Sequence, residues 1–303
     1  MALFSLRTIT LIVVLYLIDT MQARGGGMSN KRKRSGSCEL RYKKIEPEHS
    51  ACKAPSSQLV KSGVSSQDQK LIVDLHNEER RIVSPPASDM MAISWDEGLA
   101  KIAQGWASNC VYAHDKNYNR NDLGRFTVGQ NLAQGQTSWT EAVKDWASEK
   151  QFYDYDSNSS PSGEPVGHFT QMVWATSVRV GCGFALCGKK RIYVCNYGPA
   201  GNMKGESPYT SGKSCGACSS TCNNKLCDCK DALCKNGGKM DPNTCTCACK
   251  PKFYKGADCS LNCDGGMPEP SHCAGWKVHC KTVSNVPQDC PKTCGWCGAA
   301  ENA

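Results

Sequence analysis

The chain has 303 residues, 22 cysteines and a formal net charge of +8 at pH 7. Every cysteine lies beyond residue 37, and thiols at this density would not persist unpaired in a reducing cytosol. The composition therefore argues against a cytosolic protein and favours an exported, disulfide-linked one.

The N-terminus has the pattern of an export leader. Arg7 precedes an apolar stretch, Thr8 to Ile18, that is too short to span a bilayer. We expect residues 1–23 to be a signal peptide, with a retained anchor as the alternative. No later segment has the pattern of a transmembrane helix.

A basic, propeptide-like segment follows at residues 24–34 and ends in Lys31-Arg32-Lys33-Arg34, which favours proteolytic processing before Ser35. Residues 1–34 contain six Lys/Arg and one Asp, so their removal lowers the net charge from +8 to +3. A mature chain this mildly basic has no nucleic-acid-binding footprint, and we expect no nucleic-acid partner.

After an N-terminal extension (residues 35–65), the chain reads as one α/β domain. A capping-box pattern at Ser66 and helical apolar spacing predict a helix that Pro85 stops. A second helix is expected at 96–110, and a third begins with another capping box at 138–141. Two alternating stretches, 179–187 and 191–197, predict a hairpin. The Gly/Asn/Gln-rich linker between the second and third helices is expected to be a surface loop.

Polar side chains interrupt two apolar segments of this domain. Residues 167–174 read Gly-His-Phe-Thr-Gln-Met-Val-Trp, and burying such polar groups without partners would be costly. Glu149 lies on the apolar face of the third predicted helix, three residues after Trp146. A carboxylate is rarely buried alone, so a cation, a metal or a hydrogen-bond donor should meet it.

The segments 167–174 and 192–202 resemble two signature motifs of the CAP superfamily, which contains cysteine-rich secretory proteins, cysteine-rich venom proteins, antigen 5 and pathogenesis-related type 1 proteins. Residues 76–80 and 129–132 match two further family motifs. The resemblance implies an α/β/α sandwich, the CAP (SCP) domain, over residues 66–210, with the signature motifs lining a surface cleft.

The resemblance also implies a tetrad in that cleft, formed by His114, Gln130, Glu149 and His168. In several family members the histidines bind a divalent metal, so His114, His168 and Glu149 become candidate ligands for zinc. Gln130 replaces the more frequent acid, and an amide cannot take up a proton or balance the charge of a metal. A polar cleft held by hydrogen bonds alone remains the alternative.

Residues beyond 210 hold 16 of the cysteines and little that could form an apolar core. Their spacing resembles a cysteine-rich hinge (211–228), an EGF-like module (229–260) and a ShKT module (261–298). A zinc site at the two Cys-x-x-Cys pairs, 215/218 and 294/297, is the alternative. The resemblance implies the pairs Cys110–Cys187, Cys182–Cys195, Cys215–Cys222, Cys218–Cys227, Cys229–Cys245, Cys234–Cys247, Cys249–Cys259, Cys263–Cys297, Cys273–Cys290 and Cys280–Cys294, which leaves Cys38 and Cys52 for each other.

Three functions fit this sequence. The first is a secreted effector, of the kind found in venoms, that binds a membrane receptor or ion channel through its cleft and its cysteine-rich modules. Direct pore block is not expected, because residues 283–289 lack the Lys-Tyr pair of ShKT channel toxins. The alternatives are a sterol or lipid carrier and a metal-dependent hydrolase at the His₂Glu set.

Two features bear on these alternatives. The aromatic stretch 152–155 lies where the lipid-associated loop of the family begins, although packing at a helix end explains it better. Neither Thr170 nor Ser148 composes a nucleophile–base pair with the histidines, so we favour binding over catalysis. Asn158 begins a sequon for N-glycosylation.

Overall fold

The computed structural model describes residues 38–39, 42–43, 46–122, 124–230, 232–250, 253–263, 268–283 and 286–297. The expected signal peptide and the basic segment at 24–34 lie outside the described residues, as do parts of the N-terminal extension and of the last module. Within the described ranges, no helix combines the length and apolar character that crossing a membrane requires.

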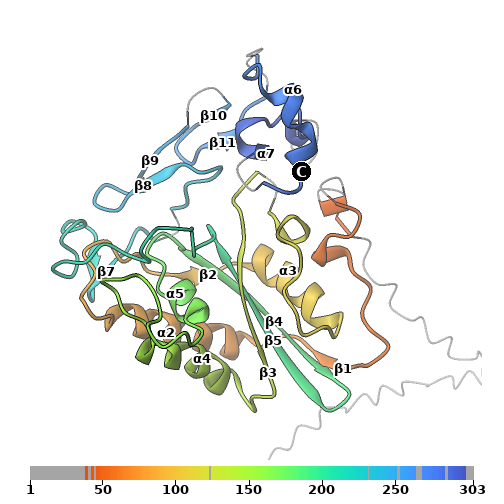
Figure 1. The fold of residues 1–303 in the computed structure, drawn as a ribbon, viewed down its shortest axis with the longest axis vertical. Helices are drawn as coiled ribbons and strands as arrows, with labels where there is room; N and C mark the ends of the chain where they lie inside the picture. Colours follow the sequence, from red (N-terminus) through yellow and green to blue (C-terminus); the bar gives the residue numbers. More distant parts are fainter. Residues whose placement is uncertain are drawn as a thin grey trace, which may run out of the picture. The chain divides into compact units, whose positions relative to one another are not determined.

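A five-stranded sheet forms the centre of the first domain (Figure 1). Its strands run in the order β1 (Leu59–Ser62), β4 (Arg179–Cys187), β5 (Lys190–Gly198) and β3 (Gly129–Gln134), and β2 (Ser94–Trp95) pairs in parallel with β4. The hairpin expected at 179–197 is confirmed, because β4 and β5 pair antiparallel along their whole length.

Strand β3 corrects the surface loop predicted between the second and third helices. Its first five residues are buried, and it pairs with β5 from Gly129 opposite Tyr197 to Gln134 opposite Ile192. The sequence did not indicate this strand, because Gln130 and Asn131 are polar and do not fit the pattern of a buried strand. Both amides are satisfied inside the protein by hydrogen bonds, which removes the cost of burying them.

The three predicted helices are confirmed, with small shifts at their ends. Helix α2 (Ser66–Arg81) is capped by the Ser65 side chain rather than by Ser66, since Ser65 Oγ accepts the Asp68 N–H. Asp96 caps α3 (Glu97–Ser108), and Ser138 caps α4 (Trp139–Ser148). A further short helix, α5 (Gly167–Met172), contains the signature segment that the sequence singled out.

The helices cover both faces of the sheet. Helix α3 packs on one face, and α2, α4 and α5 lie on the other (Figure 1). Consecutive residues of β5 alternate between the two cores: Tyr193 and Tyr197 pack with α2 and α4, and Val194 packs with α3. Gly181 and Gly183 let α3 approach closely, since a Cβ at either position would meet α3 backbone atoms at 2.4 Å or less. The architecture is the α/β/α sandwich expected from the sequence.

Short elements make up the rest of the described chain. Segments of one helical turn or less flank the sandwich, and two-stranded ribbons and short helices build the cysteine-rich region. These elements are η1 (Ser50–Cys52), η2 (Asn117–Arg120), η3 (Glu149–Gln151), β6 (Cys222–Asn223), β7 (Leu226–Cys227), β8 (Lys239–Asp241), β9 (Thr246–Ala248), β10 (Tyr254–Lys255), β11 (Ser260–Leu261), α6 (Cys273–Trp276), η4 (Lys277–His279) and α7 (Val286–Asp289).

All 22 cysteines are paired, in the ten combinations that the family resemblance implies and in Cys38–Cys52, which remained by elimination. Eight of these disulfides lie between residues 215 and 297, where the described chain has little apolar core of its own. Disulfides therefore stabilise this region, as burial of apolar side chains stabilises the sandwich.

Candidate functional site

Four different elements supply the tetrad residues. His114 lies in the loop after α3, Gln130 on the buried strand β3, Glu149 at the end of α4, and His168 in the first turn of α5. His114 is solvent-exposed, whereas Glu149 and His168 are half-buried and Gln130 is buried. Residues 114 and 168 are thus 54 positions apart in the chain, and contacts in three dimensions decide whether they act together.

Glu149 and His168 form a tight pair. Glu149 Oε1 accepts a hydrogen bond from His168 Nδ1 at 2.6 Å, and Glu149 Oε2 accepts the backbone N–H groups of His168 (2.9 Å) and Phe169 (3.0 Å). The carboxylate therefore meets the hydrogen-bond donors that its half-buried position requires. In the neutral imidazole that donates from Nδ1, the lone pair is on Nε2.

Gln130 orients the second imidazole in the same way. Its Nε2 donates to Asn196 Oδ1 at 3.1 Å, so its Oε1 faces His114 Nδ1, 2.9 Å away. An amide oxygen can only accept, so Nδ1 of His114 carries the hydrogen and Nε2 keeps its lone pair. Partial withdrawal from water is the main cause that lowers the pKa of His114, and the charges of Arg120 and His168 lower it further.

A polar chain joins the two halves of the tetrad beneath the surface. Asn131, next to Gln130, donates through Nδ2 to the backbone oxygen of His168 (3.0 Å) and to Tyr197 Oη (3.1 Å). Tyr197 Oη lies 2.9 Å from Nε2 of the fully buried His76. Burial lowers the pKa of His76 to about 4, so this imidazole is neutral at physiological pH.

Arg80 fixes the far end of α5. Its buried guanidinium donates to the backbone oxygens of Met91, Met172, Trp174 and Ala175 at 2.8–3.0 Å. Burial lowers its pKa to about 9, which still leaves a cation at neutral pH. Three of these oxygens belong to the last residues of α5 and the turn after it, so Arg80 caps the C-terminal end of the helix that carries His168.

Sequence reasoning did not assign roles to Arg80, Asn131, Asn196 or Tyr197. The signal was present for Arg80: residues 72, 76 and 80 share one face of α2, and that face is buried. A charged residue on a buried helix face needs several partners, so it indicates an internal polar network.

The N-terminal extension holds the loop that carries His114. Cys38 and Cys52 close a short loop in which Ser50 donates a hydrogen bond to the buried carboxylate of Asp115. Arg120 donates to the other oxygen of Asp115 at 2.7 Å. Asp115 is therefore fixed from two sides, and its neighbour His114 is held at the surface.

The donor atoms of the tetrad fit a bound zinc ion in part. The two free Nε2 atoms suit zinc, whereas both oxygens of Glu149 are already used by N–H donors. Glu149 thus fits the role of a carboxylate that orients a ligating histidine. In the described part of the chain, the group of three His/Cys/Asp/Glu residues with ligand atoms within 4.8 Å of one another is His272, Cys273 and Cys290. Its cysteines form a disulfide, so it offers no thiolate.

The hydroxyls near the tetrad are engaged elsewhere. The Thr170 hydroxyl donates its one hydrogen to Asn202 Oδ1 (2.8 Å), with Val166 O 3.1 Å away, and Ser148 Oγ donates to Asp145 O (2.7 Å). Among the described residues no hydroxyl forms a hydrogen bond with either tetrad imidazole. A nucleophile activated by a base would need such a contact.

The aromatic stretch after α4 packs against the domain. Tyr155 stacks on Tyr209 with ring centroids 4.9 Å apart, and its hydroxyl donates to the Tyr209 backbone oxygen at 2.6 Å. Tyr153 contacts the ring of Phe169 and donates to Asn158 Oδ1 at 2.8 Å. The amide of Asn158, the predicted glycan acceptor, in turn donates to the backbone oxygen of Glu206.

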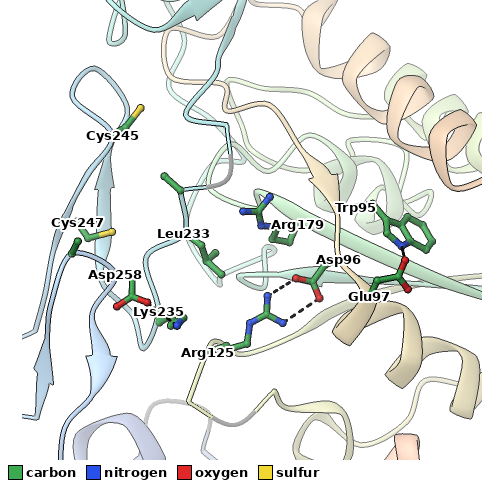
Figure 2. Close-up of a pocket in the computed structure, with 12 residues that line it drawn as sticks. Trp95, Asp96, Glu97, Arg125, Arg179, Leu233, Lys235, Cys245, Cys247 and Asp258 are labelled. Carbon is green, nitrogen blue, oxygen red and sulfur yellow. Dashed lines mark hydrogen bonds and ion pairs between the residues drawn. The ribbon is translucent and has the colours of Figure 1, made fainter. Parts of the chain in front are cut away.

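A hollow of about 610 Å³ lies between the start of α3 and the cysteine-rich residues around Lys235 and Asp258 (Figure 2). Arg125 reaches across to Asp96 and Asp122, and Lys235 pairs with Asp258 at 2.7 Å. These ion pairs balance most of the charge that lines the hollow, so the lining does not indicate a binding site for an ionic ligand.

The three-layer sandwich and the tetrad around two signature motifs define the class of CAP-domain proteins. A model described as the cysteine-rich secretory protein family matches residues 73–197. "Cysteine-rich venom protein Mr30" of Conus marmoreus is 34% identical over 273 residues, which cover 86% of this chain and 91% of that protein. The cysteine-rich venom protein of Conus textile is 32% identical over 285 residues, covering 86% and 90%. The chain belongs to the cysteine-rich secretory protein family, and both of these relatives are named as venom proteins.

Solved structures resemble the sandwich as well. Venom allergen-like protein 4 of Schistosoma mansoni is 30% identical, covers 50% of this chain and 97% of its own, and has a TM-score of 0.43. NaASP2, solved with Zn²⁺, is 25% identical, covers 57% and 98%, and has a TM-score of 0.47. Both scores are below 0.5, so the family assignment rests on sequence.

Proposed function

We propose that the protein is an exported effector that binds a membrane receptor or ion channel. The contacts would come from the surface around His114, Gln130, Glu149 and His168, together with the cysteine-rich modules. Eleven disulfides support export, since such crosslinks persist in oxidising surroundings. Residues 1–23 would act as the signal peptide, and cleavage after residue 34 would leave the Cys38–Cys52 loop attached to the CAP domain.

The hydrogen bonds made by the tetrad side chains are the reason that we favour binding over catalysis. His114 is bonded to Gln130 and His168 to Glu149, and the neighbouring hydroxyls donate to backbone or amide oxygens instead. Such a set presents fixed polar groups to a partner and offers no activated nucleophile. Rigid, crosslinked modules after residue 210 would add contact area at low cost in conformational entropy.

Recordings from a panel of voltage-gated channels, with the purified full chain applied outside the cell, test this function directly. A reversible change in the current of one channel type is the expected result. A peptidase activity that a chelator abolishes would replace binding by metal-dependent hydrolysis. A sterol or fatty acid extracted from the purified protein would indicate a carrier. Either of those results without an effect on any channel would overturn the effector proposal.

Zinc is the cofactor that we propose for the tetrad, with the Nε2 atoms of His114 and His168 as ligands and Glu149 orienting His168. The metal would lend positive charge to the surface, where an acidic group of a partner could meet it. Isothermal titration with zinc should show one site that His114→Gln and His168→Gln each weaken by about tenfold or more. The control is His279→Gln, an exposed histidine on η4. Equal affinity in all four proteins would exclude the tetrad as the zinc site.

A further inference from the structure

The last cysteine-rich module exposes apolar side chains in one short segment. Eight large apolar residues are exposed among the described residues, and three of them fall within eight positions. They are Trp276 (38% exposed), Val278 (75%) and Val283 (41%), on α6, η4 and the turn that follows. Exposure of this kind adds nothing to the stability of the module, because its fold is held by three disulfides.

The same segment is basic. Residues 271–283 contain two lysines and two histidines and no Asp or Glu. Lys277 and His279 flank Val278 and are exposed, and Lys277 forms no ion pair with any described residue. Lys281 is partly neutralised by Glu46, 2.6 Å away. The exposed side chains of Trp276, Lys277, Val278, His279 and Val283 are together called the Trp276 face.

The acidic side chains that the structure describes in the last module have partners of their own. Glu269 accepts hydrogen bonds from the backbone of Thr293 at 3.0 Å, and Asp289 lies 3.5 Å from the ammonium of Lys250. They are therefore poorly placed to neutralise Lys277. Exposed cationic and apolar side chains thus alternate along residues 276–279, with no acid between them.

We propose that the Trp276 face docks the protein on an anionic lipid surface. An indole has an apolar body and a polar N–H, which suits the boundary between headgroups and acyl chains. The valines would enter the same layer, and Lys277 would lie among anionic headgroups. His272 lies against Trp276 with ring centroids 4.3 Å apart, so less side-chain freedom would be lost when the indole inserts.

This proposal is independent of the tetrad and of zinc. Charge complementarity favours lipid over a protein partner: a segment with only positive charge matches the uniform negative charge of such a membrane. Docking would concentrate the protein at the surface where a membrane receptor lies.

Sedimentation of the full chain with vesicles tests the proposal. Vesicles of phosphatidylcholine with about 30% phosphatidylserine are compared with pure phosphatidylcholine, at low salt and at about 0.5 M NaCl, where charge attraction is screened. The double variant K277E/V278S changes the Trp276 face. Its matched control is K61E/V60S on β1, which makes the same charge change beside a valine that is 67% exposed.

Wild-type protein should bind the anionic vesicles at least about tenfold more tightly than the neutral ones, and less tightly at high salt. K277E/V278S should lose about tenfold in affinity, whereas K61E/V60S should stay within about twofold of wild type. Equal losses of affinity in the two double variants would show that only net charge matters, and would overturn the proposal. No binding of wild type to anionic vesicles would overturn it too, and would leave a protein partner as the occupant.

Tryptophan fluorescence gives a second, site-specific readout. All seven tryptophans lie in described ranges, and Trp276 is exposed while the other six are buried or half-buried. Emission should shift to the blue when anionic vesicles are added, and W276F should abolish that shift while the protein stays folded. An unchanged shift in W276F would show that the Trp276 face does not enter the lipid.

Discussion

Glu149 ties the end of α4 to the start of α5, with its Oε1 lying 2.6 Å from Nδ1 of His168. The other oxygen accepts the backbone N–H groups of His168 and Phe169, the second and third residues of α5, so one carboxylate caps a helix and fixes an imidazole. The orientation of His168 and the stability of α5 are thereby coupled.

Replacement of Glu149 by alanine should therefore lower the free energy of unfolding. The half-buried donors of His168 and Phe169 would lose their acceptor, at a cost of about 1–3 kcal/mol. Urea unfolding measures this change. Glu78→Ala, which removes an exposed carboxylate from α2, should change stability by less than about 0.5 kcal/mol. If the two variants lose the same stability, the cap contributes nothing.

Gln130→Glu should raise the pKa of His114. A carboxylate 2.9 Å from Nδ1 would favour the imidazolium. Asn196 can accommodate the change, because a turn of its amide would point the buried, unpartnered Nδ2 at the new carboxylate in place of Oδ1. NMR titration of the His114 ring measures the shift, with the exposed Gln67→Glu as control. A His114 pKa that stays unchanged would contradict the contact.

Loss of the Arg80 guanidinium should destabilise the domain strongly. Arg80→Met would leave four backbone oxygens without their donor, and we expect a loss of about 3 kcal/mol or more. Arg80→Lys should recover only part of it, because an ammonium lacks the planar set of five donors. Thermal and urea unfolding measure both. The exposed Arg191→Met serves as control, and an equally small loss in all three would refute the proposed role.

His76 should make stability depend on pH. Its pKa is lowered from 6.5 to about 4 by burial, so between these values the unfolded chain binds a proton that the folded one does not. Stability is then greatest above pH 6.5 and falls as the pH drops towards 4, by about 3 kcal/mol in all. His114, whose pKa is also lowered, adds to the loss.

The measurement is urea unfolding at a series of pH values between 4 and 7. His76→Gln should flatten the curve, whereas the exposed His279→Gln should leave its slope as in wild type. A wild-type stability that is level over this range would rule out a neutral, buried His76.

Local sequence signals predicted the helices because their causes are local. Ser138 and Asp96 cap α4 and α3 through bonds to residues three positions on, and apolar spacing marks the buried faces. Strand β3 escaped the same reasoning. Gln130 and Asn131 are buried by virtue of partners 37 to 66 positions away, and no local pattern encodes such partners.

For the tetrad, too, the sequence predicted one part and the structure supplied the rest. Family motifs singled out His114, Gln130, Glu149 and His168, and the apolar surroundings of Glu149 required a donor near it. The identity of that donor, the free Nε2 atoms and the support from Asn131 and Arg80 came only with the coordinates.

The sequence by itself predicted the three longer helices, because capping and apolar periodicity act over short distances, and its signature motifs marked the chain as CAP-type by resemblance. Tertiary structure decided which tetrad residues contact each other: Glu149 is hydrogen-bonded to His168, and Gln130 to His114. The physical reason is that a hydrogen bond needs its two atoms about 3 Å apart, and for residues far apart in the chain only the packed sheet and helices bring that about.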